Sequence, residues 1–107
     1  MATLDTTEFN ALCTGLKKMV IDECKVRGVT AEQIDNDDSV IAGRGALQLD
    51  SLDAVEIVGA LDRHLGMALD SVGASKQAFK SFRVLSEHVA KSAEPARIQA
   101  FIAKYSS

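Results

Sequence analysis

Apolar residues recur at three- and four-residue steps near the start of the chain. The positions are Phe9, Leu12, Cys13, Leu16, Met19, Val20 and Cys24. This spacing forms one apolar stripe along a helix, with the charged residues largely on its other side. Thr6 or Thr7 can cap its start, and Gly28 is a good stop signal. The pattern predicts a helix from about Thr7 to Arg27.

A second apolar pattern predicts a helix from about Ser51 to Leu65. We expect its apolar side to consist of Leu52, Val55, Ile57, Val58, Leu61 and Leu65. Acidic residues concentrate in its first half, and Arg63 and His64 stand in its last turn, so both charges suit the helix dipole. Gly66 follows as the stop signal.

The connection between these two helices is long and polar. Thr30 and Gln33 have the spacing of a capping box, which predicts a single helical turn. The acidic run at residues 35–39 lacks the glycine and the closing glutamate of a calcium-binding EF-hand, so we interpret it as a solvated loop. Val40–Ala42 is a short apolar segment that can anchor the connection to the core.

Three further helices are predicted after residue 70. A short one spans Ser75–Phe82, and a core helix spans about Val84–Lys91. Pro95 fits the first turn of a tail helix. Its apolar stripe consists of Ile98, Phe101, Ile102 and Tyr105. We expect this stripe to pack on the protein's own body; docking on a partner or on a second copy is the alternative.

These elements predict an all-α fold. We expect a small antiparallel helical bundle of three long helices and one short helix, with an extra C-terminal amphipathic helix. The 107 residues fit a single domain with a core at about residues 7–91 and an extension at about 94–105. Only 5% of the residues are aromatic, so an aliphatic core is expected.

Charge and cysteine content narrow the function classes. A net charge of −3 and a pI of about 5.3 disfavour nucleic acid as a partner. We interpret Cys13 and Cys24 as reduced thiols of a cytoplasmic protein, and no metal-ligand spacing accompanies them. No signal peptide and no membrane span is expected, because no apolar run is long enough. We expect a monomer.

Ser51 is the candidate functional residue. It stands at a predicted helix N-terminus, where the helix dipole favours negative charge, so its hydroxyl suits attachment to a phosphate. No catalytic base is expected, because His64 lies about three and a half turns away and no G-x-S-x-G elbow surrounds the serine. A plain helix N-cap is the alternative interpretation of Ser51. The sequence therefore predicts no enzyme.

The stretch Leu49–Val58 contains the motif Asp50-Ser51-Leu52. With this stretch at the head of its second predicted helix, the chain resembles acyl carrier proteins over roughly Leu12–Ala90. The resemblance implies that Ser51 carries 4'-phosphopantetheine from coenzyme A, and that acyl groups are bound as thioesters to the thiol of this group. Asp50 and Leu52 are the other cofactor-binding residues that it implies, and Asp50 would contribute to recognition by the enzyme that attaches the group. The partner-binding residues it implies are Asp53, Glu56 and Asp62. A phosphopantetheinyl transferase and acyl-processing enzymes of fatty acid, lipid A or secondary-metabolite synthesis would be the partners.

Some residues depart from the pattern of that family. Gly59 stands where larger apolar residues are usual, and it either widens an acyl cavity or lets another helix approach closely. Arg63 and His64 replace acidic residues, which suggests a specialised carrier. A peptidyl or aryl carrier of a nonribosomal or polyketide system is one alternative function. A helical adaptor that binds partners through the tail stripe is the other.

Overall fold

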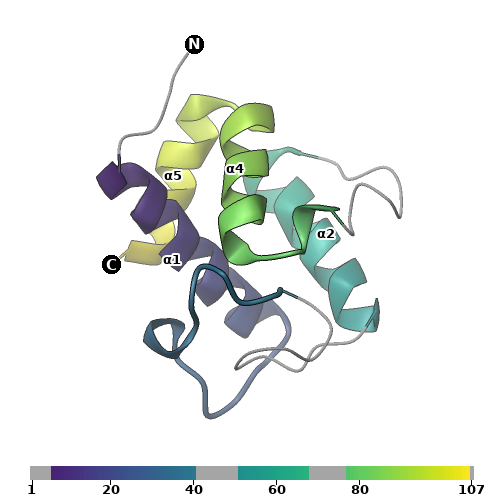
Figure 1. Cartoon of the computed structure of the whole chain (residues 1–107). Coiled ribbons are helices and arrows are strands. Elements are labelled where there is room, and N and C mark those ends of the chain that lie inside the picture. Colours follow the sequence, from purple (N-terminus) through teal and green to yellow (C-terminus); the bar gives the residue numbers. More distant parts are fainter. Residues whose placement is uncertain (1–5, 41–50, 68–76, 107) are drawn as a thin grey trace.

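The structure is a computed structural model that describes residues 6–40, 51–67 and 77–106. These residues form four α-helices and no strand: α1 (Thr6–Glu23), α2 (Ser51–Leu65), α4 (Phe82–Ser92) and α5 (Pro95–Ser106), with a 3-10 turn at Ala31–Gln33. In Figure 1, α1 and α5 lie on one side, α2 on the other, and α4 in front between them. The predicted all-α helical bundle is confirmed.

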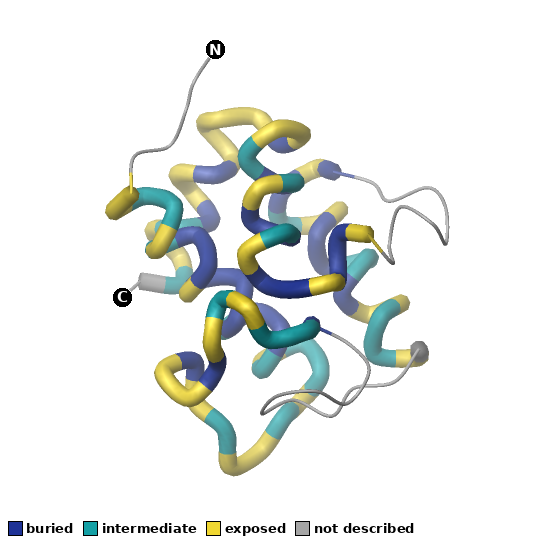
Figure 2. The backbone as a smooth tube through the Cα atoms, in the orientation of Figure 1, coloured by how far each residue is buried: buried dark blue, intermediate teal, exposed yellow. Residues whose placement is uncertain are grey.

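The core is mainly aliphatic, as predicted, with three phenylalanines. All four α-helices contribute side chains with almost no exposed surface; among the largest are Leu12, Leu16, Met19, Ile57, Leu61, Leu65, Phe82, Leu85 and Ile98. In Figure 2, buried segments occur in all four helices, mostly where the helices face one another. Burial of each such side chain contributes about 1.5–3 kcal/mol, so the inward stripes hold the bundle together.

The tail helix α5 packs on the protein's own body. Ile98 and Phe101 are each only 2% exposed, and Ile102 and Tyr105 are partly buried against the same core. Gln99 donates a hydrogen bond to Glu8 near the start of α1. The expected packing of the tail stripe is confirmed.

Two contacts show that α5 runs in the same direction as α1. Gln99, early in α5, contacts Glu8, early in α1, while Lys18 farther along α1 donates to the backbone oxygen of Tyr105 at 2.9 Å. Gly15 lies between these contacts, and a Cβ there would be 3.0 Å from Cε2 of Phe101. Glycine in the middle of α1 therefore lets α5 approach closely.

The first helix is shorter than predicted. It ends at Glu23 instead of Arg27, because Lys25 adopts a left-handed conformation with φ of 53°. The N–H of Val26 then donates to the carbonyl of Ile21 at 2.9 Å, which closes the helix end. Gly28 also has a positive φ, but it lies in the connection after the helix end. The earlier end lets Val26 pack against the core.

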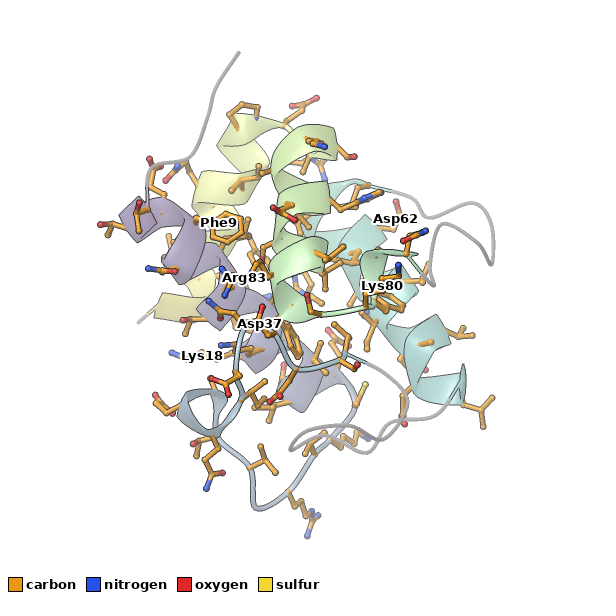
Figure 3. The ribbon with its side chains drawn as sticks, in the orientation of Figure 1. Phe9, Lys18, Asp37, Asp62, Lys80 and Arg83 are labelled. Atoms are coloured by element: carbon orange, nitrogen blue, oxygen red, sulfur yellow. The ribbon has the colours of Figure 1, made fainter. Side chains whose placement is uncertain are left out.

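The connection after α1 is fixed to the bundle as far as Val40. The Lys17 ammonium donates to the Asn36 side chain at 2.6 Å, and Arg83 of α4 pairs with Asp37 at 2.7 Å (Figure 3). The N–H of Arg83 also donates to the Asn36 carbonyl at 2.7 Å. Val40 is fully buried, which confirms that part of the predicted apolar anchor; residues 41 and 42 lie outside the described residues.

The capping-box prediction in the same connection is confirmed. The N–H of Thr30 donates to the Gln33 side chain at 3.0 Å, and the chain forms one 3-10 turn there. This turn places Ala31 and Ile34 in the core.

The region before α4 differs from the prediction of a short helix through Phe82. Gln77 and Ala78 are helical, Phe79 and Lys80 form a turn, and Ser81 adopts an extended conformation as the N-cap of α4. Its hydroxyl accepts a hydrogen bond from the N–H of Val84 at 3.1 Å. Because a serine cap fixes a new helix start, Phe82 belongs to α4, which begins two residues before Val84. Ser75 and Lys76 lie outside the described residues.

Candidate functional site

The first residue of α2 is Ser51, as the sequence predicts. Asp50, predicted to support this site, lies outside the described residues, and so does the side chain of Ser51. The first N–H groups of an α-helix have no partner within the helix, so the backbone at this end can donate hydrogen bonds to a negatively charged group.

The end of α1 lies against the first turn of α2. The Cys24 thiol is 3.8 Å from the carbonyl oxygen of Asp53 and contacts it as a weak donor. On its inner side, α2 is fixed by Ile57, which is fully buried. The first turn of α2 therefore has a defined place on the bundle.

Two large apolar side chains next to Ser51 are exposed. Leu52 is 76% exposed and Val55 is 69% exposed, whereas both were expected on the apolar side of the helix. That expectation is wrong because α2 has two apolar rows. Ile57, Leu61 and Leu65 face the core, while Leu52, Val55 and Gly59, at steps of three and four, follow a separate outward row.

The predicted partner-binding carboxylates border this outward row. Glu56 and Asp62 are exposed, and Asp53 is half-buried. Glu56 and Asp62 are six residues apart, which places them about 120° apart around the helix. They therefore stand on opposite sides of the row formed by Leu52, Val55 and Gly59. The Arg63 guanidinium lies next to Gly59, so the apolar part of this row is Leu52 and Val55.

The surroundings of Gly59 bear on one of the two roles considered for it. A Cβ at this position would meet only Nη1 of Arg63, at 3.4 Å, among the described residues. Within the described part of the chain, no other helix packs closely against Gly59. The bare backbone instead leaves room for the Arg63 side chain, which pairs with Glu23 of α1 at 2.9 Å.

Gly66 ends α2, as predicted. It has a φ of 65°, and the guanidinium of Arg97 lies against it. A Cβ at Gly66 would be 2.8 Å from Nη1 of Arg97. A cation at this place also suits the negative end of the helix dipole.

His64 does not act on Ser51. The two residues are 13 positions apart on one helix, roughly 20 Å along its axis. The His64 ring instead contacts Glu23, with Nε2 3.4 Å from Oε1. A catalytic base must lie within hydrogen-bond distance of the serine that it activates. His64 therefore cannot form a serine–histidine pair with Ser51.

The two cysteines, both in the described part of the chain, form no disulfide. Cys13 is buried and accepts a hydrogen bond from the Ser86 hydroxyl at 3.0 Å. Burial raises the pKa of the Cys13 thiol above its ordinary value, so the thiol stays protonated at neutral pH. The sequence pattern did not indicate Ser86, which is fully buried and which we interpret as a structural partner of Cys13.

The acidic run at residues 35–39 has structural partners. The guanidinium of Arg83 lowers the pKa of Asp37, and the Asp38 carboxylate accepts a hydrogen bond from the N–H of Asp35 at 2.9 Å. Over the described ranges, no group of three or more histidine, cysteine or acidic side chains could hold a metal ion. In the same ranges, no helix has the length and apolar character needed to cross a membrane.

Comparisons with family models, with curated proteins and with solved structures gave no match for this chain. The likeness to acyl carrier proteins therefore rests on the residues around Ser51 and on the order of the helices.

Proposed function

We propose that this protein is an acyl carrier. It holds acyl groups as thioesters on a 4'-phosphopantetheine group joined to Ser51 and delivers them to acyl-processing enzymes. The observation that supports this most is the start of α2 at Ser51, directly before an exposed apolar row bordered by acidic residues.

The residues at the start of α2 fit such a group. A phosphodiester at Ser51 would lie at the positive end of the helix dipole, near backbone N–H donors. When bound, the group supplies the thiol that forms the thioester. The protein needs no base beside Ser51, because the transferase would activate the hydroxyl. The chain's own contribution is to hold the first turn of α2 in place and to present it to enzymes.

The outward row of α2 suits brief encounters with such enzymes. Leu52 and Val55 would enter apolar pockets, and Glu56 and Asp62 would face basic side chains at the margins. Charged margins raise the rate of encounter and make it sensitive to salt. A small apolar contact keeps the complex weak enough to dissociate, as a shuttle requires. We also propose that it works as a monomer in the cytoplasm, where its thiols stay reduced.

The helical adaptor is the weaker alternative. It requires an exposed tail stripe, but Ile98 and Phe101 are buried against the core.

An acyl carrier and a peptidyl or aryl carrier differ in the group that they carry. Mass analysis of whatever is bound as a thioester to the purified protein separates those two.

Attachment is tested by intact mass after incubation with coenzyme A and a transferase of broad specificity. The wild-type protein should gain the mass of one phosphopantetheine group, and Ser51→Ala should gain none. Ser92→Ala is the matched control, because Ser92 is an exposed serine on α4, and it should gain the group normally. A wild-type protein that gains no mass, or a Ser51→Ala protein that does, contradicts the proposal.

A further inference from the structure

Lys17 is the one lysine among the described residues that is buried. Only 7% of its surface is exposed, although lysine is almost never so buried without a pairing partner. Its ammonium donates to the side-chain oxygen of Asn36 at 2.6 Å, and no carboxylate of the described residues forms an ion pair with it. The polar partner of Lys17 is therefore a neutral side chain from the connection between α1 and α2.

Residues 35–39, here called the strap, contain this side chain. The N–H of Asp35 donates to the Asp38 carboxylate at 2.9 Å, and the N–H of Asp38 donates to the carbonyl of Asp35 at 3.1 Å. These two bonds close the strap into one turn, so it moves as one piece. Its neighbours along the chain, Ile34 and Val40, are buried in the core and fix its two ends.

The strap is also bound to the start of α4. The Asn36 carbonyl accepts from the N–H of Arg83 at 2.7 Å, and the Asp38 carbonyl accepts from the N–H of Phe82 at 3.2 Å. The Arg83 guanidinium pairs with Asp37 at 2.7 Å (Figure 3). In Figure 1 the strap crosses α1 beside the lower end of α4, where that helix begins. The strap therefore bridges α1 and α4 through polar contacts.

The side chains of the strap are all polar. Residues 35–39 are three aspartates, an asparagine and a serine, each exposed or half-buried. Lifting the strap therefore brings no apolar side chain of its own into water, and water replaces the hydrogen bonds that it loses. Segments held in this way open at a lower free energy than the whole fold. The start of α4 stays in place, because Ser81 still caps the N–H of Val84 and Phe82 is buried in the core.

We propose that the strap is a lid over Lys17, which opens between its two anchored ends while the helices stay packed. In the closed state Asn36 holds the Lys17 ammonium, and in the open state the ammonium reaches water. Only an amine that reaches water reacts with a dissolved acylating agent, so the lid determines when Lys17 can be modified. The lid does not depend on the carrier function, so either proposal can fail alone.

Acetylation of the full-length protein by a low excess of acetic anhydride tests the lid. Digestion and mass spectrometry give the rate at each lysine, and Lys17 should react more than about tenfold more slowly than the exposed Lys91. About 1 M urea should leave this ratio nearly unchanged, because opening of the strap exposes little surface. Hydrogen exchange of the Phe82 and Arg83 amides should be equally insensitive to urea, whereas exchange of the Leu85 amide should rise with it.

Asn36→Ala removes the acceptor of Lys17. Acetylation of Lys17 should then be about tenfold faster than in the wild type, the effect of one hydrogen bond to a charged group. Asn10→Ala is the matched control at an exposed position on α1 and should keep the wild-type rate.

Four results would overturn the lid. One is acetylation of Lys17 in the wild type as fast as that of Lys91. Another is a rate at Lys17 that rises steeply with urea, which would mean that only global unfolding exposes it. The third is an unchanged rate in Asn36→Ala. The last needs no substitution: it is exchange of the Phe82 amide that rises with urea as steeply as that of Leu85.

Discussion

A pair of glycine substitutions tests how α5 packs. Gly15 and Gly59 both lie inside α-helices, so replacement by alanine should stabilise either helix by about 1 kcal/mol through helix propensity alone. Their surroundings differ. At Gly59 the new Cβ meets only the end of the flexible, exposed Arg63 side chain, at 3.4 Å. Gly59→Ala should therefore stabilise the protein by about 0.5–1 kcal/mol.

At Gly15 the new Cβ would be 3.0 Å from Cε2 of Phe101 and 3.6 Å from Cβ of Tyr105. Phe101 is only 2% exposed and cannot move without shifting α5. Overpacking of this kind costs about 1–3 kcal/mol, which offsets or exceeds the gain in propensity. Gly15→Ala should therefore change the free energy of unfolding by between about zero and −2 kcal/mol.

Urea unfolding followed by far-UV circular dichroism measures both variants. The two free energies of unfolding should differ by about 0.5–3 kcal/mol, with Gly59→Ala the more stable. Since about 1 kcal/mol shifts the melting temperature of a domain near this size by roughly 4–8 °C, thermal melts should show the same order. Equal stabilisation of both variants would refute the close approach of α5 to Gly15. Destabilisation by Gly59→Ala would refute the outward placement of Gly59.

Three further predictions concern the surface and the tail. Leu52→Asp or Val55→Asp should lower kcat/KM of the transferase about tenfold or more, because about 1.5–3 kcal/mol of apolar burial in the complex is lost. The melting temperature should stay nearly unchanged. An unchanged kcat/KM would contradict the docking role. Arg83 lowers the pKa of Asp37, so the wild type should melt at a higher temperature than Asp37→Asn at neutral pH. The difference should shrink as pH falls from about 4, the ordinary pKa of aspartate, through the lowered pKa of Asp37, and should vanish only below it. A difference independent of pH would contradict the pair. Deletion of residues 94–107 should remove several kcal/mol of burial and lower the melting temperature, and an unchanged melting temperature would refute the packing of α5.

The sequence predicts those features of the fold that depend on periodicity and caps. Both ends of α2 are predicted, because Ser51 and Gly66 are strong signals at a regular apolar pattern. The burial of Ile98 and Phe101 is predicted because an apolar stripe needs a partner surface. These inferences need only local sequence.

Features that depend on tertiary contacts are predicted less well. The sequence does not predict the end of α1 correctly, because Lys25, rather than a glycine, adopts the left-handed conformation there. Leu52 and Val55 are misplaced because apolar character alone does not separate two rows on one helix. A wheel with 100° steps anchored on Leu61 and Leu65 places Leu52 on the far side but Val55 only at the flank, so the signal is clear for Leu52 alone. The need for glycine at position 15 cannot be inferred from the sequence, because it depends on where Phe101 lies in the fold.

The contacts among Glu23, Arg63, His64 and Lys104 near the helix ends also cannot be predicted from the sequence alone. Glu23 and Arg63 are 40 positions apart, and Lys104 is another 41 positions beyond Arg63. Their positions near helix ends suggest interaction with helix dipoles, which is true of many residues. Only the packing of the helices brings these charges to the His64 ring.

The most direct test of the proposed function is the site of attachment. The wild-type chain is incubated with coenzyme A and the transferase, digested, and analysed by tandem mass spectrometry. The carrier account predicts one phosphopantetheine group per chain, on the peptide that contains Ser51 and on that serine. A chain that stays unmodified, or that carries the group on another residue, contradicts it.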